Sequence, residues 1–398
     1  MLPADGGEPA PRRFVLRGRV VTMTGEDEVE RFRSTLKEAA ARGGAYIYHL
    51  AEGVDQKAYD CFVLLERNGL LASSLAAVHA LALGPQDLSR LAGAGSKLLW
   101  SPLSNLVLYG ETQGPRDIRD SGIAFAIGSD WSPTGSKNLL EELKVAWWLN
   151  LQDGSPLSAF DLARSVTAQA AETVGWHGRL GTLRPGMLAD LLVLRGRAED
   201  PYLQLIEATE HDVGLVVVGG VPRYGDLATM EDLDPGPLEE LEVAGRRRAF
   251  HLDPEVEGRG AFREPDGRPG AFPSLAAATD LLTRALRDPR RFASVQVQRR
   301  GLTSATLEGH EEELTLELDY GRPDDWSLVD WLTRRAPVVV RRVPTEWRGP
   351  RLDALHVDAE HLETVAKQPN LPSGLKDYLA DVYTRRAPHA AGARTGGP

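Results

Sequence analysis

The sequence predicts an α/β fold built as part of a (β/α)8 barrel, and three observations support this prediction. Short apolar segments rich in β-branched residues alternate with segments of helical periodicity. The apolar segments end near residues 22, 49, 79, 101 and 130, at steps of 27, 30, 22 and 29 residues that match the length of a βα unit. The last four each close on a polar side chain, and this end of the strands is where a barrel places its active site.

The predicted elements follow one another in a regular order. Strands are expected at residues 14–22, 45–49, 75–79, 97–101 and 123–130, and helices at residues 28–41, 55–67, 85–91 and 138–149. An open doubly wound sheet gathers its ligands at one switch point rather than at four strand ends, and no G-x-G-x-x-G motif follows the first strand. The barrel is therefore preferred. It is partial, because five βα units are visible and a full barrel has eight.

Composition restricts the classes of function. The 398 residues carry a formal net charge of −11, with 42% hydrophobic and 26% charged residues. These proportions are typical of a globular chain, and the acidity argues against a nucleic-acid partner. No apolar run reaches the roughly 18 residues of a membrane helix, and the first residues lack the apolar core of a secretory signal. Cys61 is the lone cysteine, so we expect a cytoplasmic protein without membrane association.

Four motifs at the strand ends carry a family resemblance. They are HLAEG at 49–53, VHALAL at 78–83, SPLSNL at 101–106 and GSDW at 128–131. In this order and at this spacing they resemble the amidohydrolase superfamily. They are most similar to its branch of guanine deaminases, methylthioadenosine/adenosylhomocysteine deaminases and triazine chlorohydrolases. The resemblance implies a metal-dependent, deaminase-like hydrolase that acts on non-peptide C–N bonds of a small-molecule substrate.

The resemblance also implies a domain organisation. Family order makes the visible strands barrel strands 4 to 8, with residues 14–22 as strand 4 or as an opening sandwich strand; the 27-residue step to His49 favours strand 4. Residues 180–191 and 213–224 resemble the family's small β-sandwich. We therefore expect a barrel portion at 13–178, sandwich strands at 179–235 and a C-terminal α+β extension of unknown role at 236–398. Within this extension, residues 362–383 are predicted to be helical and interrupted at 369–372.

Hydrolysis of an unreactive C–N bond near neutral pH needs an activated water, which a bound zinc ion can supply. His49 can offer an imidazole ligand, and Asp130 a carboxylate that binds metal and accepts the water's proton. Glu52, three residues after His49, can move a proton to the substrate nitrogen. The resemblance implies that His79 orients the water, and Asn105 and Trp131 are candidate substrate contacts.

Each of these residues also has a purely structural interpretation. His49 and His79 could be core histidines, Glu52 a solvated loop carboxylate and Asp130 a turn cap. The functional signal is weaker at three other residues. Ser101 and Asn105 are typical turn formers, and Trp131 could pack against other side chains without contacting a substrate.

The sequence departs from the family at one important point. Family members carry a His-x-His pair at the end of strand 1, and both histidines bind metal. None of the nine histidines here is separated from another by a single residue. His49 and Asp130 give two ligands, whereas a catalytic zinc site usually has three. The alternative prediction is therefore a catalytically incomplete barrel that acts as a binding or structural protein, or one completed by an oligomer or a second chain.

Overall fold

The computed structural model describes residues 26–131, 134–196, 198–243, 245–252, 274–287 and 359–386. Contacts divide the chain into two units, one comprising Met1–Gly220 and Asp358–Pro398 and the other Val221–Val357. The strand predicted at residues 14–22 lies outside the described residues. The three-part division expected from the sequence stays a prediction.

The first unit contains a parallel sheet whose strands follow chain order. These are β1 (Tyr46–Leu50), β2 (Leu75–His79), β3 (Lys97–Trp100) and β4 (Phe125–Ile127), in the order β1-β2-β3-β4. Every neighbouring pair is parallel. The predicted parallel α/β arrangement is confirmed, with a fourth strand shorter than expected; closure into a barrel stays a prediction.

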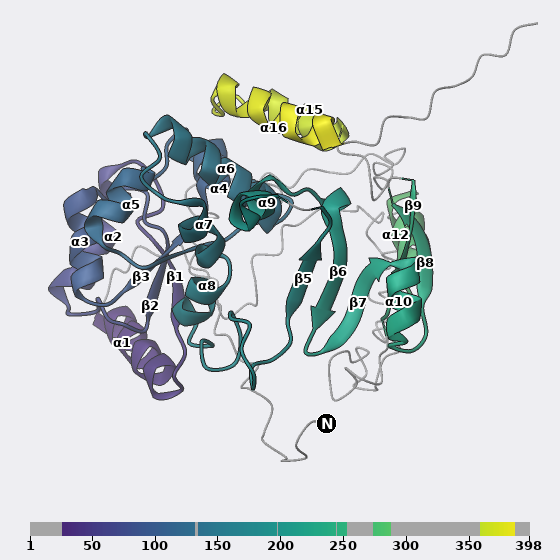
Figure 1. Cartoon of the computed structure of the whole chain (residues 1–398). Helices are drawn as coiled ribbons and strands as arrows, with labels where there is room; N and C mark the ends of the chain where they lie inside the picture. The colour runs from purple at the N-terminus through teal and green to yellow at the C-terminus, as the bar shows by residue number, and fades with distance from the viewer. Residues whose placement is uncertain are drawn as a thin grey trace, which may run out of the picture. The chain divides into compact units, whose positions relative to one another are not determined.

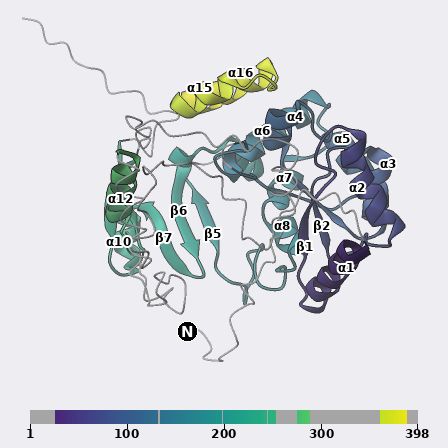
Figure 2. The same cartoon turned by 180° about the vertical axis from the view of Figure 1, so that it is seen from behind.

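Helices connect the parallel strands and cover them (Figures 1 and 2). They are α1 (Glu26–Ala41), α2 (Gln56–Arg67), α3 (Pro85–Gly93), α4 (Pro102–Tyr109), α5 (Pro115–Ser121), α6 (Leu139–Gln152), α7 (Ala159–Ser165) and α8 (Ala168–Thr173). The predicted helices at 28–41, 55–67, 85–91 and 138–149 are thus confirmed within a few residues. Local signals fix their starts: Asp55 caps α2, Asn138 caps α6, and α3, α4 and α5 each begin with proline.

The first unit continues into an antiparallel pair of strands. β5 (Leu191–Leu194) pairs with β6 (Val213–Val218), and α9 (Pro201–Glu207) and the short helix η1 (Glu210–Asp212) lie between them in sequence. The strands expected from residues 213–224 are confirmed as β6 and, in the second unit, β7 (Val221–Asp226).

Two C-terminal helices pack on the first unit. These are α15 (Ala359–Lys367) and α16 (Ser373–Arg386), with an interruption where the sequence predicts one. Leu375 and Leu379 of α16 lie in a buried cluster with Leu103 and Leu106 of α4 and Val145 of α6. Side chains of α16, α4 and α6 therefore share one buried cluster.

The second unit has an antiparallel sheet in the order β7-β9-β8, from β7, β8 (Glu239–Val243) and β9 (Arg246–Phe250). It also contains α10 (Leu227–Leu233) and α12 (Leu275–Arg287). The Glu239 carboxylate accepts hydrogen bonds from the first backbone amides of α12, at Leu275 and Ala276. Within the described part of the chain, no helix combines the length and apolar character that a membrane span requires.

Candidate functional site

Two neighbouring strands bring two histidines to the same end of the parallel sheet. His49 is the penultimate residue of β1 and His79 the last residue of β2. The strand register pairs Leu50 with His79, so the carboxyl ends of β1 and β2 are level. The two imidazole rings lie 5.0 Å apart, nearly perpendicular at 80°.

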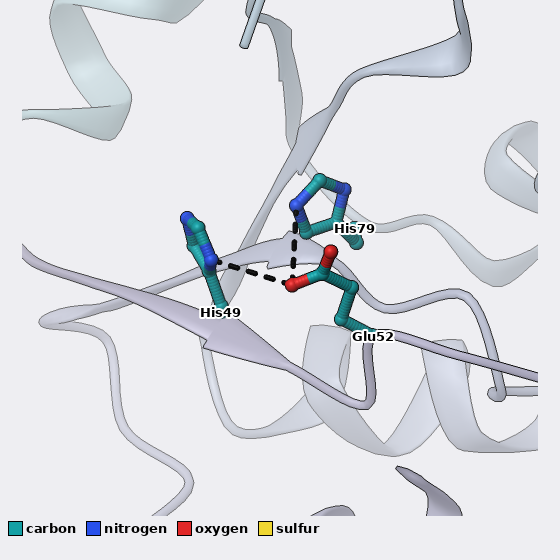
Figure 3. Close-up of side chains that lie close together, drawn as sticks. All are labelled: His49, Glu52 and His79. Carbon is teal, nitrogen blue, oxygen red and sulfur yellow. Dashed lines mark ion pairs between the residues drawn. The ribbon is translucent and has the colours of Figure 1, made fainter. Parts of the chain in front are cut away.

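Two carboxylates face these imidazoles. Oε2 of Glu52, just after β1, lies 3.4 Å from Nδ1 of His49 and 3.7 Å from Nε2 of His79, as Figure 3 shows. Oδ2 of Asp130, which follows β4, lies 3.8 Å from the same Nε2 atom of His79. All four residues that the sequence singled out for chemistry are therefore brought together at the carboxyl ends of the strands.

A buried hydrogen-bond chain fixes the orientation of His79. Nδ1 of His79 is 2.8 Å from Oδ1 of Asn105, while the amide nitrogen of Asn105 donates to Thr112 and reaches Gln113. Because this leaves the amide oxygen to face His79, Nδ1 must carry the proton and donate it. Nε2 is then the ring nitrogen that faces Glu52 and Asp130.

One helix supports three of these residues. From α4, Ser104 donates to Oδ2 of Asp130, Asn105 accepts from His79, and the Tyr109 hydroxyl donates to Oε1 of Glu52 over 3.0 Å. Sequence reasoning missed Ser104 and Tyr109.

The reason for this omission is the interpretation of residues 101–105 as a turn, which is wrong because Pro102 begins a helix. A proline at the first helical position followed by an apolar run was the available signal. It would have placed residues 105 and 109 on one helical face.

The backbone at the strand ends adopts an unusual conformation. His79 and Asp130 have positive φ angles of 65° and 57°, and Ala51 and Ala80 both have φ of 50°. This left-handed region costs free energy for residues with a side chain, and it concentrates at functional sites. Here it turns the chain directly after the strands, so that the side chains of His79 and Asp130 face one another.

The environment keeps Glu52 ionised and Tyr109 protonated. Burial raises the pKa of Glu52, but the imidazoles of His49 and His79 and the Tyr109 hydroxyl lower it more, so that the net pKa is below the ordinary value. Burial and the neighbouring Glu52 raise the pKa of Tyr109 far above its ordinary value. Tyr109 is therefore a donor to a carboxylate at neutral pH.

The donor set fits a metal ion. One ligand atom from each of His49, Glu52 and His79 lies within 4.8 Å of the others. Oε2 of Glu52 is buried and accepts no hydrogen bond from the described residues, and such an atom is costly unless a cation or proton approaches it. Imidazole nitrogens and a carboxylate oxygen are the ligands that zinc accepts in proteins.

The two candidate substrate contacts lie in different environments. Asn105 is completely buried, and both ends of its amide are engaged inside the protein. Trp131 is 60% exposed. A direct substrate contact stays a prediction for both, and the observed contact of Asn105 is with His79.

Comparison with known proteins tests the resemblance of the motifs. Residues 33–223 match the model of the amidohydrolase family. This segment belongs to the amidohydrolase superfamily. The superfamily predicted from the four motifs is thereby confirmed, and the matched residues include His49, Glu52, His79 and Asp130.

Several of the similar proteins are deaminases. The chain is 27% identical over 182 residues to a 5-methylthioadenosine/S-adenosylhomocysteine deaminase of Pyrococcus abyssi, and 28% identical over 181 residues to a 5'-deoxyadenosine deaminase of Methanopyrus kandleri. In both alignments 42% of this chain and 42% of the relative are covered, so the chain spans about two fifths of the length of these relatives. A zinc-bound adenosine deaminase structure from Xanthomonas campestris is 24% identical and covers 49% of this chain and 48% of its own, with a TM-score of 0.45.

Proposed function

We propose that this chain is a metal-dependent, deaminase-like hydrolase that acts on a non-peptide C–N bond of a small molecule. The observation that carries the proposal is the approach of Glu52 and Asp130 to Nε2 of His79, with His49 on the other side of Glu52. The deaminase names of the relatives support an adenosine-like substrate class.

The residues divide the work as follows. His49 and Asp130 would hold a divalent ion, with zinc favoured by the nitrogen and oxygen donors. When bound, such an ion would lower the pKa of a water molecule, so that its deprotonated form is available as a nucleophile near neutral pH. Glu52, held through its other oxygen by Tyr109, moves a proton to the leaving nitrogen. His79, fixed by Asn105, orients the water, and Trp131 borders the substrate.

The superfamily supports a specific placement of the strands in a barrel. On this proposal, β1 to β4 are barrel strands 5 to 8. The carboxyl ends of β1, β2 and β4 then contribute to one rim, as expected for catalytic groups in this architecture.

A second candidate function rests on a different observation. The sequence has no pair of histidines separated by one residue. This favours a catalytically incomplete protein that binds a small molecule or partner, or a site that a second copy or another chain completes.

Metal content and activity of the purified chain separate the two candidates. Zinc would be quantified by mass spectrometry, and ammonia release would be followed with 5'-deoxyadenosine and 5'-methylthioadenosine. The active-site variant is Asp130→Asn, and Asp120→Asn is its matched control because Asp120 is an exposed partner of Arg119. Ammonia release abolished by the first variant and kept by the second supports the hydrolase; release unchanged in Asp130→Asn refutes the assigned roles. Bound zinc without turnover favours the second candidate.

A further inference from the structure

We propose that Glu142 of α6 is a positioning residue for Asp130, and that it acts through Ser104 of α4 and through the loop that follows Asp130. The inference rests on the proposed function in taking Asp130 as a group of the reaction. It extends that function to a side chain in the first turn of α6 that is completely buried. Both oxygens of this side chain are hydrogen-bonded, each to a different segment of the chain.

The first contact of Glu142 holds the start of α4. Among the described residues, the N-cap residue Ser101 makes no side-chain hydrogen bond to this helix, so the first backbone amides of α4 need other acceptors. Oε1 of Glu142 accepts from the backbone amide of Leu103 over 2.9 Å. Ser104, the next residue, donates its hydroxyl to Oδ2 of Asp130. Glu142 therefore holds the turn of helix that carries the donor to Asp130.

The second contact of Glu142 reaches the loop after Asp130. The Ser136 hydroxyl is hydrogen-bonded to Oε2 of Glu142, and the Ser136 backbone amide donates to the carbonyl oxygen of Ser129 over 3.1 Å. Ser129 directly precedes Asp130, whose φ of 57° lies in the left-handed region. Because such a conformation persists only where the surrounding structure holds it, the bond between Ser136 and Ser129 supports the backbone of Asp130.

The two contacts meet at one hydrogen bond of the site. The path through α4 ends at the side chain of Asp130, and the path through the loop ends at its backbone. One carboxyl group thus fixes the positions of both Ser104, the donor, and Asp130, the acceptor. Displacement of a reacting group by about 1 Å can lower a rate by about 100-fold, so a residue outside the reacting groups can matter for the rate.

The neutral form of Glu142 fits both contacts. Burial raises the pKa of this carboxyl group well above its ordinary value of 4.5, the Leu103 amide lowers it less, and the charges of Glu141 and Asp130 raise it further. A neutral carboxyl group has one oxygen that accepts from Leu103 and a hydroxyl that can donate to Ser136. Glutamine offers the same acceptor and a donor on a side chain of similar size. Glu142→Gln should therefore keep both contacts, whereas Glu142→Ala removes them.

Kinetics and hydrogen exchange of the full-length chain test this role. Ammonia release from 5'-deoxyadenosine would be measured at saturating Zn²⁺ for Glu142→Ala, Glu142→Gln and Ser136→Ala. Asn150→Ala is the matched control, because Asn150 is also completely buried in α6 and its amide makes two hydrogen bonds, both to the backbone of Leu157. Amide exchange would be followed in peptides that contain Leu103 or Ser136, which requires no turnover.

The inference predicts a loss of rate that stability alone does not explain. We expect kcat to fall by about 100-fold in Glu142→Ala with KM changed by less than about threefold, because Asp130 acts in the chemical step. Ser136→Ala, which removes one of the two contacts, should lose about tenfold. Glu142→Gln and Asn150→Ala should stay within about threefold of the unmodified chain. Exchange of the peptides with Leu103 and Ser136 should become at least about tenfold faster in Glu142→Ala but not in Asn150→Ala.

Several results would overturn the inference and leave the proposed function intact. These are equal kcat values in Glu142→Ala and Asn150→Ala, or a Glu142→Gln variant as slow as Glu142→Ala. If Glu142→Ala fails to fold, an unchanged kcat in Ser136→Ala has the same meaning.

An unmodified chain that releases no ammonia removes the proposed function, and exchange then decides the positioning role by itself. Faster exchange at Leu103 and Ser136 that is confined to the Glu142→Ala and Ser136→Ala variants supports the role. Exchange equal to that of Asn150→Ala overturns it.

Discussion

The C-terminal helices are predicted to stabilise the candidate site through α4, and Leu375→Ala tests this connection. Leu375 of α16 is completely buried in the cluster that contains Leu103 and Leu106 of α4. Three other side chains of α4 contact the site. Ser104 contacts Asp130, Asn105 contacts His79, and Tyr109 contacts Glu52. The substitution should therefore loosen α16 first and affect the site indirectly.

The size of the effect follows from the buried position. Replacing a fully buried leucine with alanine costs about 2–5 kcal/mol, depending on how far the surroundings collapse into the cavity. We expect about 3 kcal/mol, because a pair of helices near the chain end can shift toward the cavity. Such a change corresponds to roughly 150-fold in the equilibrium between docked and undocked helices.

Native-state hydrogen exchange measures this equilibrium directly. Amide protection in α15 and α16 should fall by roughly 150-fold in Leu375→Ala, with a smaller decrease in α4. Leu151→Ala is the matched control, since Leu151 of α6 is 45% exposed and its replacement should change stability by at most about 0.5 kcal/mol. Equal protection of α15 and α16 in the two variants would refute the packing argument.

Three further predictions concern the site and its surroundings. Tyr109→Phe removes the hydrogen bond that positions Oε1 of Glu52, so the rate of ammonia release should fall by up to about 100-fold, and an unchanged rate would exclude a positioning role. Burial raises the pKa of Glu142 well above its ordinary value of 4.5, so the folded protein retains this proton and stability should fall as pH rises above about 4.5. Glu142→Gln should flatten that dependence in urea unfolding at several pH values, and equal slopes in both proteins would contradict it. Zinc at about 100 times its dissociation constant should stabilise the fold by about 2.7 kcal/mol, and an unfolding temperature that is insensitive to zinc and chelator would argue against binding to the native state.

The strands and helices of the parallel sheet could be predicted because their signals are local. Alternation of apolar segments with helical periodicity located β1 to β4 and the helices α1, α2, α3 and α6 within a few residues, whereas α4 was interpreted as a turn. The shorter β4 was harder to predict, because the apolar residues Ile123 and Ala124 precede Phe125–Ile127 without a local signal for the start of the strand.

The supporting contacts of the site could not be predicted in the same way. The hydrogen bond from Ser104 to Asp130 joins residues 26 positions apart, and that from Tyr109 to Glu52 joins residues 57 positions apart. Such contacts depend on how α4 packs against the sheet and against α16, which no local pattern encodes. The same holds for the burial of Asn105, whose residue type is equally common in turns.

The sequence by itself determined the superfamily, the parallel βα order and the four side chains at the strand ends, because each depends on residue types at fixed spacing. The tertiary structure alone decided which atoms face one another. Among the described residues it left Oε2 of Glu52 without a hydrogen-bond donor between two imidazoles, engaged Asp130 with Ser104, and oriented His79 through Asn105. These features arise from packing between segments distant in sequence, and packing is a property of the folded chain as a whole.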